Sequence, residues 1–227
     1  MVKLLELFKG TGSFGKSAKR LGWSVTSLDN EAKYSPDILV DVLKWNYKDL
    51  DFIPDVITAS PPCATFSRMA LTKRTKYISS QEAGTPGMSS RVRNSDTLKP
   101  LNDYARLGDA LLKRTIEIIN YWRKKNPKLK FIMENPRGSM HRSPLMVKLR
   151  PYDLATTYYC FYGDTRTKQT DFFNNFDLQL KKGSCRGTEL TRLMPLCKKY
   201  RIPQPLINSI FKQVTENKIS TKNKSND

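Results

Sequence analysis

The sequence predicts an α/β fold with a doubly wound, mostly parallel sheet. Short apolar runs rich in β-branched residues recur along the first half of the chain, and connections of helical length separate several of them. Strands joined in this way usually pair in parallel. Glycine, aspartate or proline lies within two residues after each of these runs, at the strand ends where open α/β sheets bind ligands.

The elements are expected in the following order. Four strands are predicted at residues 2–8, 23–28, 38–40 and 56–59. A glycine-rich turn over 9–15 and a short helix over 17–21 separate the first two. Apolar residues at helical spacing from Leu101 to Trp122 predict a long amphipathic helix. Further strands are predicted at 131–133, 156–162 and 171–176.

Two segments show no clear periodicity. Residues 64–100 are polar and rich in Ser, Thr, Gly and Arg, which is typical of a functional or disordered loop. Residues 215–227 are rich in Lys, Asn and Ser and are expected to form a frayed tail.

The charge balance indicates a polyanionic partner. The 227 residues include 40 Lys and Arg against 21 Asp and Glu, a formal net charge of +19. Residues 64–100 hold seven basic residues against two acidic ones, and residues 181–201 hold seven against one. Basic residues concentrated in two loop segments favour phosphate contacts, so nucleic acid is the expected partner.

Several classes of protein are disfavoured. No apolar run approaches the roughly 18 residues of a membrane span, and the N-terminus has no signal-peptide pattern. Four cysteines without a CxxC pair, and a single histidine, argue against a zinc site. We therefore expect no metal, reduced thiols, and a monomer in the cytoplasm, or in the nucleus of a eukaryotic host.

Cys63 is the most informative single residue. It follows the predicted strand 56–59 through Ser60-Pro61-Pro62, and the prolines end that strand because they cannot continue the ladder. This position favours a nucleophilic thiolate held on a constrained backbone, and disfavours an inert cysteine buried in the core. Glu134, in Glu134-Asn135-Pro136, follows another strand. It can cap a helix, pair with an arginine, or face the same crevice as Cys63.

The turn after the first strand is suited to a cofactor. Gly10 and Gly12 let a ligand approach the backbone, and Asp29, at the end of the second strand, can accept hydrogen bonds from the ribose of an adenosine-containing cofactor. Asp41 follows the third strand and can reach the adenine amino group. Gly15 completes the spacing of a dinucleotide fingerprint, so the spacing alone leaves NAD open.

A thiolate and a carboxylic acid in one crevice are what nucleophilic attack on a cytosine ring requires. The thiolate adds to C6, and the acid hydrogen-bonds the N3/N4 edge as N3 gains electron density. The addition makes C5 a carbon nucleophile that can accept a methyl group.

These residues together resemble the DNA cytosine-5 methyltransferase family, and in particular its small phage and viral members. Residues 8–12 resemble the cofactor turn, with Ser13 where a further glycine is usual. Residues 60–63 resemble the nucleophile motif and 134–136 the Glu-Asn motif, with Pro136 where valine is common. Residues 162–171 and 201–207 resemble two later motifs, although the usual Gly-Asn before the last motif is absent.

The resemblance implies a methyltransferase (Rossmann-like) sheet, S-adenosylmethionine as cofactor and double-stranded DNA, possibly RNA, as substrate. The implied catalytic residues are Cys63, Glu134 and Arg166, with Lys168 where a second arginine is common. The implied cofactor residues are Phe8, Gly10, Thr11, Gly12, Ser13, Phe14, Asp29, Asn30, Asp41, Val42 and Pro61. The implied DNA contacts are Arg68, Lys73, Arg74, Arg91, Arg93, Arg137, Lys168, Arg186 and Arg192.

The resemblance also implies a division of the chain. Residues 1–176 and 201–214 form the catalytic domain, and 177–200 form a reduced target-recognition segment. Residues 64–100 correspond to a mobile catalytic loop that closes over DNA when the target base flips out.

Three other functions are compatible with parts of this pattern to different degrees. Amino methyltransferases stack an aromatic ring on the base from a Pro-Pro-Tyr or Pro-Pro-Phe motif, and Cys63 cannot stack. A tRNA cytosine-5 methyltransferase of the same family, and an inactive homologue that binds nucleic acid or cofactor, both stay open.

Overall fold

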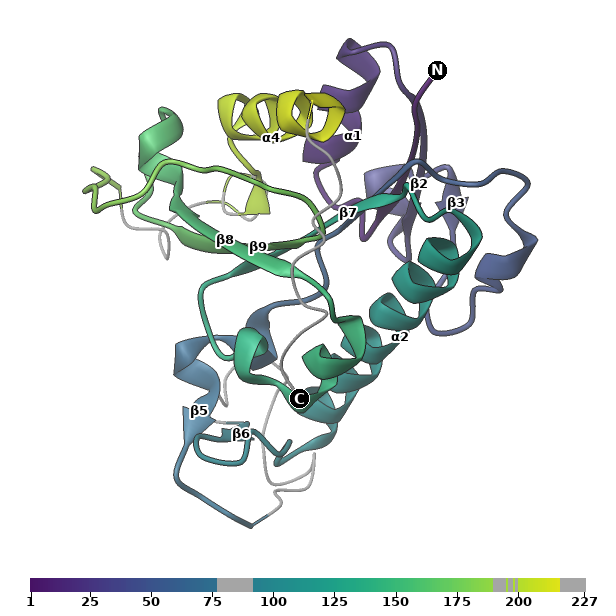
Figure 1. Cartoon of the computed structure of the whole chain (residues 1–227). Helices are drawn as coiled ribbons and strands as arrows, with labels where there is room; N and C mark the ends of the chain where they lie inside the picture. The colour runs from purple at the N-terminus through teal and green to yellow at the C-terminus, as the bar shows by residue number, and fades with distance from the viewer. Residues whose placement is uncertain (77–91, 190–194, 196–197, 199, 217–227) are drawn as a thin grey trace.

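The computed structural model contains one seven-stranded sheet (Figure 1) and describes residues 1–76, 92–189, 195, 198 and 200–216. The strand order is β3-β2-β1-β4-β7-β9-β8. The strands are β1 Lys3–Leu7, β2 Ser24–Asp29, β3 Ile38–Leu39, β4 Val56–Ala59, β7 Lys130–Pro136, β8 Asp153–Tyr158 and β9 Gln169–Asn174. The first five in spatial order pair in parallel, and β9 pairs antiparallel with both β7 and β8. The predicted doubly wound, mostly parallel sheet is confirmed.

Helices cover both faces of this sheet (Figure 1), so alternate residues of each central strand enter different cores. Helices α1 (Ser13–Arg20) and α4 (Gln204–Glu216) pack on the face that receives Leu4 of β1. Helix α2 (Asp103–Lys125) packs on the face that receives Leu5 and Leu7. None of the helices in the described part of the chain has both the length and the apolar character needed to cross a membrane.

Several element boundaries differ from those predicted. Helix α1 begins at Ser13 instead of residue 17, because Gly12 adopts φ 67° and turns the chain directly into the helix. Strands β8 and β9 begin and end earlier than predicted, and residues 159–162 form a 3-10 turn instead of strand. Helix α4 continues to Glu216, beyond the predicted domain boundary at 214.

Strand β7 runs to Pro136, although the proline was expected to end it after residue 133. The parallel ladder with β4 does stop at the pair Ala59–Met133. The antiparallel partner β9 continues beyond it and pairs Glu134 with Phe172 and Pro136 with Thr170. Glu134 is therefore held inside a strand, with pairing on one side only.

The described parts of segment 64–100 contain short elements of secondary structure. Two 3-10 turns, Ala64–Phe66 and Arg68–Ala70, precede β5 (Leu71–Thr72), which pairs in parallel with β6 (Arg93–Asn94). Residues 77–91 of the predicted mobile loop lie outside the described residues.

Arg93 is a structural residue, and the expectation that it contacts DNA is wrong. Its side chain is 1% exposed and forms an ion pair of 2.8 Å with Asp109 of α2. Its guanidinium also donates to the backbone carbonyls of Thr65, Leu98 and Ala105. Arg93 thus fastens segment 64–100 to the start of α2.

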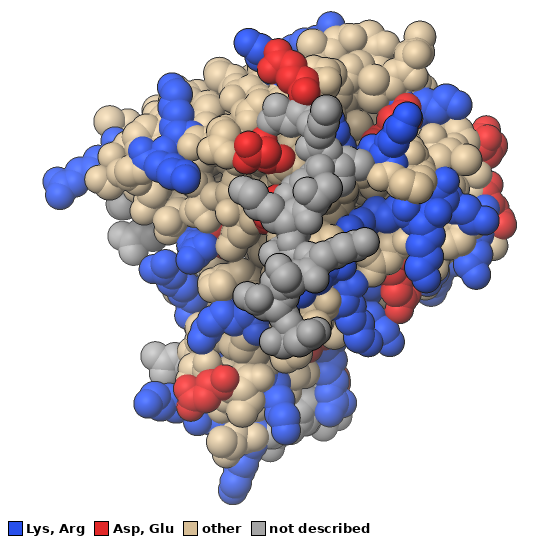
Figure 2. Space-filling view, viewed as in Figure 1, with Lys and Arg blue, Asp and Glu red and all other residues tan. Residues whose placement is uncertain are grey.

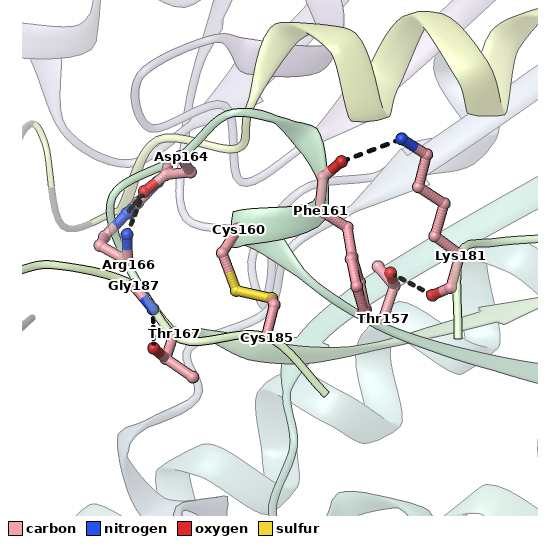
Figure 3. The surroundings of a disulfide bond; sticks show 9 residues. All are labelled: Thr157, Cys160, Phe161, Asp164, Arg166, Thr167, Lys181, Cys185 and Gly187. Carbon is pink, nitrogen blue, oxygen red and sulfur yellow. Dashed lines mark hydrogen bonds and ion pairs between the residues drawn. A yellow bond between two sulfur atoms is a disulfide. The ribbon is translucent and has the colours of Figure 1, made fainter. Parts of the chain in front are cut away.

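Cys160 and Cys185 form a disulfide (Figure 3), so the expectation of reduced thiols is wrong for this pair. Cys160 lies in the 3-10 turn Tyr159–Tyr162 that follows β8. Lys181 lies beside the same turn, where its Nζ donates to the carbonyl of Phe161 at 3.1 Å. Folding brings two cysteines 25 residues apart into bonding distance and ties segment 181–189 to the sheet. Cys197 lies outside the described residues.

Strand β1 carries a buried carboxylate, Glu6, which is 3% exposed. Its Oε1 accepts a hydrogen bond of 3.0 Å from the Gly15 amide in the first turn of α1. Its Oε2 has no hydrogen-bond partner among the described residues. Gly15 is required here, because a Cβ at that position would lie 2.4 Å from Oε2. Burial raises the pKa of Glu6 from 4.5 to about 7, against the opposing effect of the Gly15 hydrogen bond.

Removal of the disulfide should destabilise the fold. Replacing both Cys160 and Cys185 by serine releases a loop with a sequence separation of 25 in the unfolded chain. We expect the free energy of unfolding to fall by about 3 kcal/mol. Urea denaturation without reductant measures this difference. Addition of reductant should lower the free energy of unfolding of the wild type to that of the variant. Equal stabilities without reductant would contradict the prediction.

The buried carboxyl of Glu6 should make stability depend on pH. Its pKa is raised on folding, so between about pH 4.5 and 7 the folded state keeps a proton that the unfolded state loses. Stability is therefore lost as the pH rises through this window. Relative to wild type, Glu6→Gln should gain about 3 kcal/mol of unfolding free energy between pH 4.5 and pH 8.

Denaturant melts at the two pH values measure this gain. Glu117→Gln, on the exposed side of α2, is the matched control and should show no such trend. A difference between Glu6→Gln and wild type that stays constant with pH would refute the prediction.

Candidate active site

A cavity of about 290 Å³ lies at the carboxyl ends of the central strands. Its described walls come from the turn after β1, the residues after β2 and β4, the end of β7, and side chains from α2, Tyr200 and Ile202. The nucleophile candidate Cys63 and the acid candidate Glu134 both line it. The structure therefore brings together two residues that are 71 positions apart in the printed sequence.

Cys63 is held by the segment that leaves β4. The carbonyl of Pro61 accepts a hydrogen bond of 3.1 Å from the Asn135 side chain, which ties this segment to β7. The carbonyl of Cys63 accepts from Phe66 at 3.0 Å and opens the following 3-10 turn. Cys63 is partly exposed and is not in a disulfide. Its thiol is thus available at the cavity wall on a constrained backbone.

The carboxyl of Glu134 is oriented by two neighbours. The hydroxyl of Tyr159 donates to Glu134 Oε1 at 3.2 Å, and Lys168 Nζ lies 3.7 Å from the same oxygen. Complete burial, followed by the nearby charge of Glu134, raises the pKa of Tyr159 well above its ordinary value, so the phenol keeps the proton that it donates. Glu134 is therefore fixed between a hydroxyl donor and an ammonium group.

Arg166 does not line this cavity, and the expectation that it stands beside the target base is wrong. Its side chain is 1% exposed and forms an ion pair with Asp164 (Figure 3). Its guanidinium also donates to the carbonyls of Lys198 and Arg201, each at 2.8 Å. Among the described residues that line the cavity, the basic side chains are Lys9 and Lys168. Lys168 is the one in contact with Glu134.

The turn after β1 is held open by backbone conformation. Phe8, Gly10 and Gly12 all have positive φ, of 58°, 48° and 67°. The carboxylate of Asp29 accepts the Gly10 amide at 2.9 Å and the Glu31 amide at 3.0 Å, and so links the ends of β1 and β2. Of the predicted cofactor residues, those that line the cavity are Phe8, Gly10, Thr11, Ser13, Phe14, Asp29, Asn30 and Pro61.

Ser13, in place of the usual glycine, has a structural role. Its Oγ lies 2.9 Å from Thr11 Oγ1 and accepts a hydrogen bond of 3.2 Å from the Ile202 amide. This bond joins the cofactor turn to the segment that leads into α4.

Three predicted cofactor residues are absent from the described walls of the cavity: Gly12, Asp41 and Val42. Gly12 precedes α1. The carboxylate of Asp41 accepts the Leu43 amide at 2.9 Å, and Val42 is 3% exposed. Asp41 thus stabilises its own turn.

The predicted DNA contacts differ in exposure. Arg68, Lys73, Arg74 and Arg186 are exposed, and Figure 2 shows Lys and Arg over much of one face of the molecule. Arg137 is partly buried and forms an ion pair of 3.0 Å with Asp171. Arg91 and Arg192 lie outside the described residues.

Other residues of the cavity wall carry no direct signal in the sequence. Tyr104 and Tyr200 line it and are 38% and 49% exposed. Partial burial, followed by the nearby Cys63, raises the pKa of both phenols, which therefore stay protonated beside the thiol. Glu6 also lines the cavity, and an acid inside an apolar run was a signal that could have identified it.

Among the described residues, no group of three His, Cys, Asp or Glu side chains is placed to hold a metal ion. The groups present are a thiol, an oriented carboxyl, an ammonium and a glycine turn fastened to a carboxylate. They suit nucleophilic addition to an electron-poor ring next to a bound cofactor.

Comparison with solved structures finds distant likenesses. A Dnmt2 methyltransferase of S. pombe matches at 13% identity with a TM-score of 0.46, covering 76% of this chain and 48% of that one. The Entamoeba histolytica methyltransferase EhMeth matches at 12% identity with a TM-score of 0.47, covering 84% and 57%. This chain thus spans about half the length of these two proteins, and the fold assignment rests on its own strand order. No family model matches the sequence.

Comparison with curated proteins is more specific. The chain is 38% identical over 194 residues to a "Probable DNA (cytosine-5)-methyltransferase" of Frog virus 3 (isolate Goorha). The match covers 83% of this chain and 77% of the viral protein. This extent of identity, together with the convergence of Cys63 and Glu134 in one cavity, shows that the chain belongs to the DNA (cytosine-5)-methyltransferase family.

Proposed function

We propose that this protein transfers a methyl group from S-adenosylmethionine to C5 of a flipped cytosine in DNA, through a covalent bond between Cys63 and the base. One observation supports the proposal above the others. Cys63 and Glu134 face a cavity that also contains the glycine turn and Asp29. Nucleophile, acid and cofactor turn therefore meet at one edge of the sheet.

The cavity fits the proposed cofactor. The turn at Gly10 exposes its backbone, and the carboxylate of Asp29 and the side chain of Asn30 stand beside it for hydroxyl groups of a ribose. Oε2 of Glu6, which has no hydrogen-bond partner among the described residues, adds a buried polar atom to the same wall. When bound, the cofactor supplies an electrophilic methyl group.

The chain's own residues carry the rest of the chemistry. The Cys63 thiolate forms a bond to C6, and the π pair of the C5–C6 double bond moves to C5 and is delocalised towards N3. The carboxyl of Glu134 hydrogen-bonds the N3/N4 edge of the base, and Lys168 adds positive charge beside that carboxyl. After C5 gains the methyl group, it gives its proton to solvent water, the C5–H electron pair re-forms the double bond, and the thiolate leaves C6, which restores the aromatic ring.

The basic surface supports DNA as the partner. Exposed cations in segment 64–76, together with Arg186, can contact phosphates on either side of the flipped base. We also propose that the enzyme is a monomer and acts where DNA is present inside a cell.

The proposal is tested by transfer of labelled methyl to duplex DNA, single-stranded DNA and tRNA in parallel. We expect label in 5-methylcytosine of DNA. Cys63→Ala should abolish transfer, because no other described residue of the cavity supplies a thiol, and should leave cofactor binding intact. Residual transfer above a few per cent would contradict the role of Cys63.

The substrate series separates the alternatives. Label only in tRNA would place the enzyme in the RNA-modifying branch. No label on any substrate, with the cofactor still bound, would indicate an inactive homologue that retains binding.

Lys168 and Arg166 should respond differently to loss of charge. Lys168→Met removes the ammonium beside Glu134, so we expect kcat to fall about 10- to 100-fold, the loss of one charge-assisted contact. Lys168→Arg should recover most of it. Arg166→Met breaks a buried ion pair and should lower the free energy of unfolding by about 3 kcal/mol or more.

Single-turnover kinetics and denaturant melts distinguish the two effects. A Lys168→Met protein with normal kcat would show that the ammonium does not act in the reaction. An Arg166→Met protein of normal stability would remove the structural role of Arg166.

A further inference from the structure

A second and larger cavity adjoins the reaction cavity. It measures about 1150 Å³, and its described walls come from the turn after β1, helix α1, residues 33–34, residues 162–165, residue 198 and residues 201–205. It shares wall residues with the reaction cavity, namely Lys9, Gly10, Thr11, Ser13, Tyr34 and Ile202. The two spaces are therefore neighbours across the cofactor turn.

The charge on this cavity is almost entirely positive. Six basic side chains line it: Lys9, Lys16, Arg20, Lys33, Lys198 and Arg201. The acid among its described lining residues is Asp164, whose carboxylate is already paired with Arg166. Lys198 and Arg201 belong to the basic segment 181–201 that was expected to contact phosphates. The other four come from three separate segments, none of which was expected to contact DNA.

Two of these cations come from separate segments of the chain. Arg20 is the last residue of α1, and Arg201 lies in the segment before α4. Both are exposed, and within the described part of the chain neither forms an ion pair. Lys33 and Lys198 do form ion pairs, but with glutamates that are 48% and 42% exposed. Exposed ion pairs contribute little free energy, so a phosphate group can displace the glutamate from each lysine.

We propose that this cavity binds phosphate groups of the nucleic-acid backbone next to the target nucleotide. The inference rests on the proposed function, since it assigns the path of the substrate strand. A cavity of this size exceeds what a small ligand requires. Phosphates follow one another at about 3.4 Å of rise along a strand, and arginine binds each through a planar fork. A strand whose base enters the reaction cavity places its adjacent phosphates against these cations.

The test is the salt dependence of DNA affinity in the whole chain. Arg20→Glu with Arg201→Glu should weaken binding of a short labelled duplex at least about tenfold, and should reduce the slope of log K against log salt by about 1.8, the loss of two phosphate contacts. Cofactor binding by calorimetry should be unchanged. Arg20→Lys with Arg201→Lys should keep most of the affinity.

A matched control carries the same change in net charge. Lys124 is an exposed residue in the last turn of α2, and Lys128 is an exposed residue shortly before β7. Both therefore lie near the amino ends of the parallel strands. Lys124→Glu with Lys128→Glu should leave affinity and slope close to wild type. Equal losses in both double variants, or no loss in the first, would overturn the inference.

A free polyphosphate is the rival ligand of the same chemistry. Tripolyphosphate that binds the wild type but not the Arg20/Arg201 variant, with DNA affinity equal in both proteins, would assign the cavity to such a ligand and overturn the nucleic-acid assignment. A wild-type protein that binds no DNA at all would instead refute the proposed function, and this inference with it.

Discussion

Parallel pairing at the centre of the sheet is the constraint on which the site depends. The ladders align Leu7 with Leu28 and with Ala59, and Ala59 with Met133. The three parallel ladders therefore stop level with one another. The next residues along the chain are Phe8 of the glycine turn, Asp29, Ser60 before Cys63, and Glu134. Backbone register alone brings the candidate cofactor turn, the candidate ribose acid, the candidate nucleophile and the candidate catalytic acid to one edge of the sheet.

The antiparallel strand β9 completes the arrangement. It pairs with β7 beyond the point where β4 stops, so Glu134 stays in extended backbone with its carboxyl toward the cavity. Lys168 immediately precedes β9 and is brought to 3.7 Å from that carboxyl. Tyr159, from the turn after β8, donates to the same oxygen. One change in strand direction thus positions the acid and both of its neighbours.

Positive charge serves two separate purposes in this molecule. Arg93 and Arg166 are 1% exposed, and each joins loop segments through an ion pair and several carbonyls. Burial of a guanidinium requires such partners, because an uncompensated buried charge is strongly destabilising. Exposed cations such as Arg20 and Arg201 remain available to phosphates. The disulfide between Cys160 and Cys185 holds segment 181–189 beside the Arg166 network, so covalent and ionic contacts support the same region.

The sequence by itself determined the sheet and predicted the candidate nucleophile and acid. Apolar periodicity marks strands and helices, and a proline or glycine soon after a strand marks a ligand-binding edge, because both signals are local. Only the tertiary structure decided which arginines are buried, that Lys168 and not Arg166 stands beside Glu134, that Asp41 lies away from the cavity, and that two cysteines form a disulfide. These outcomes depend on which distant segments meet. The residue type alone gives the charge of a side chain, but tertiary packing determines its burial and its partners.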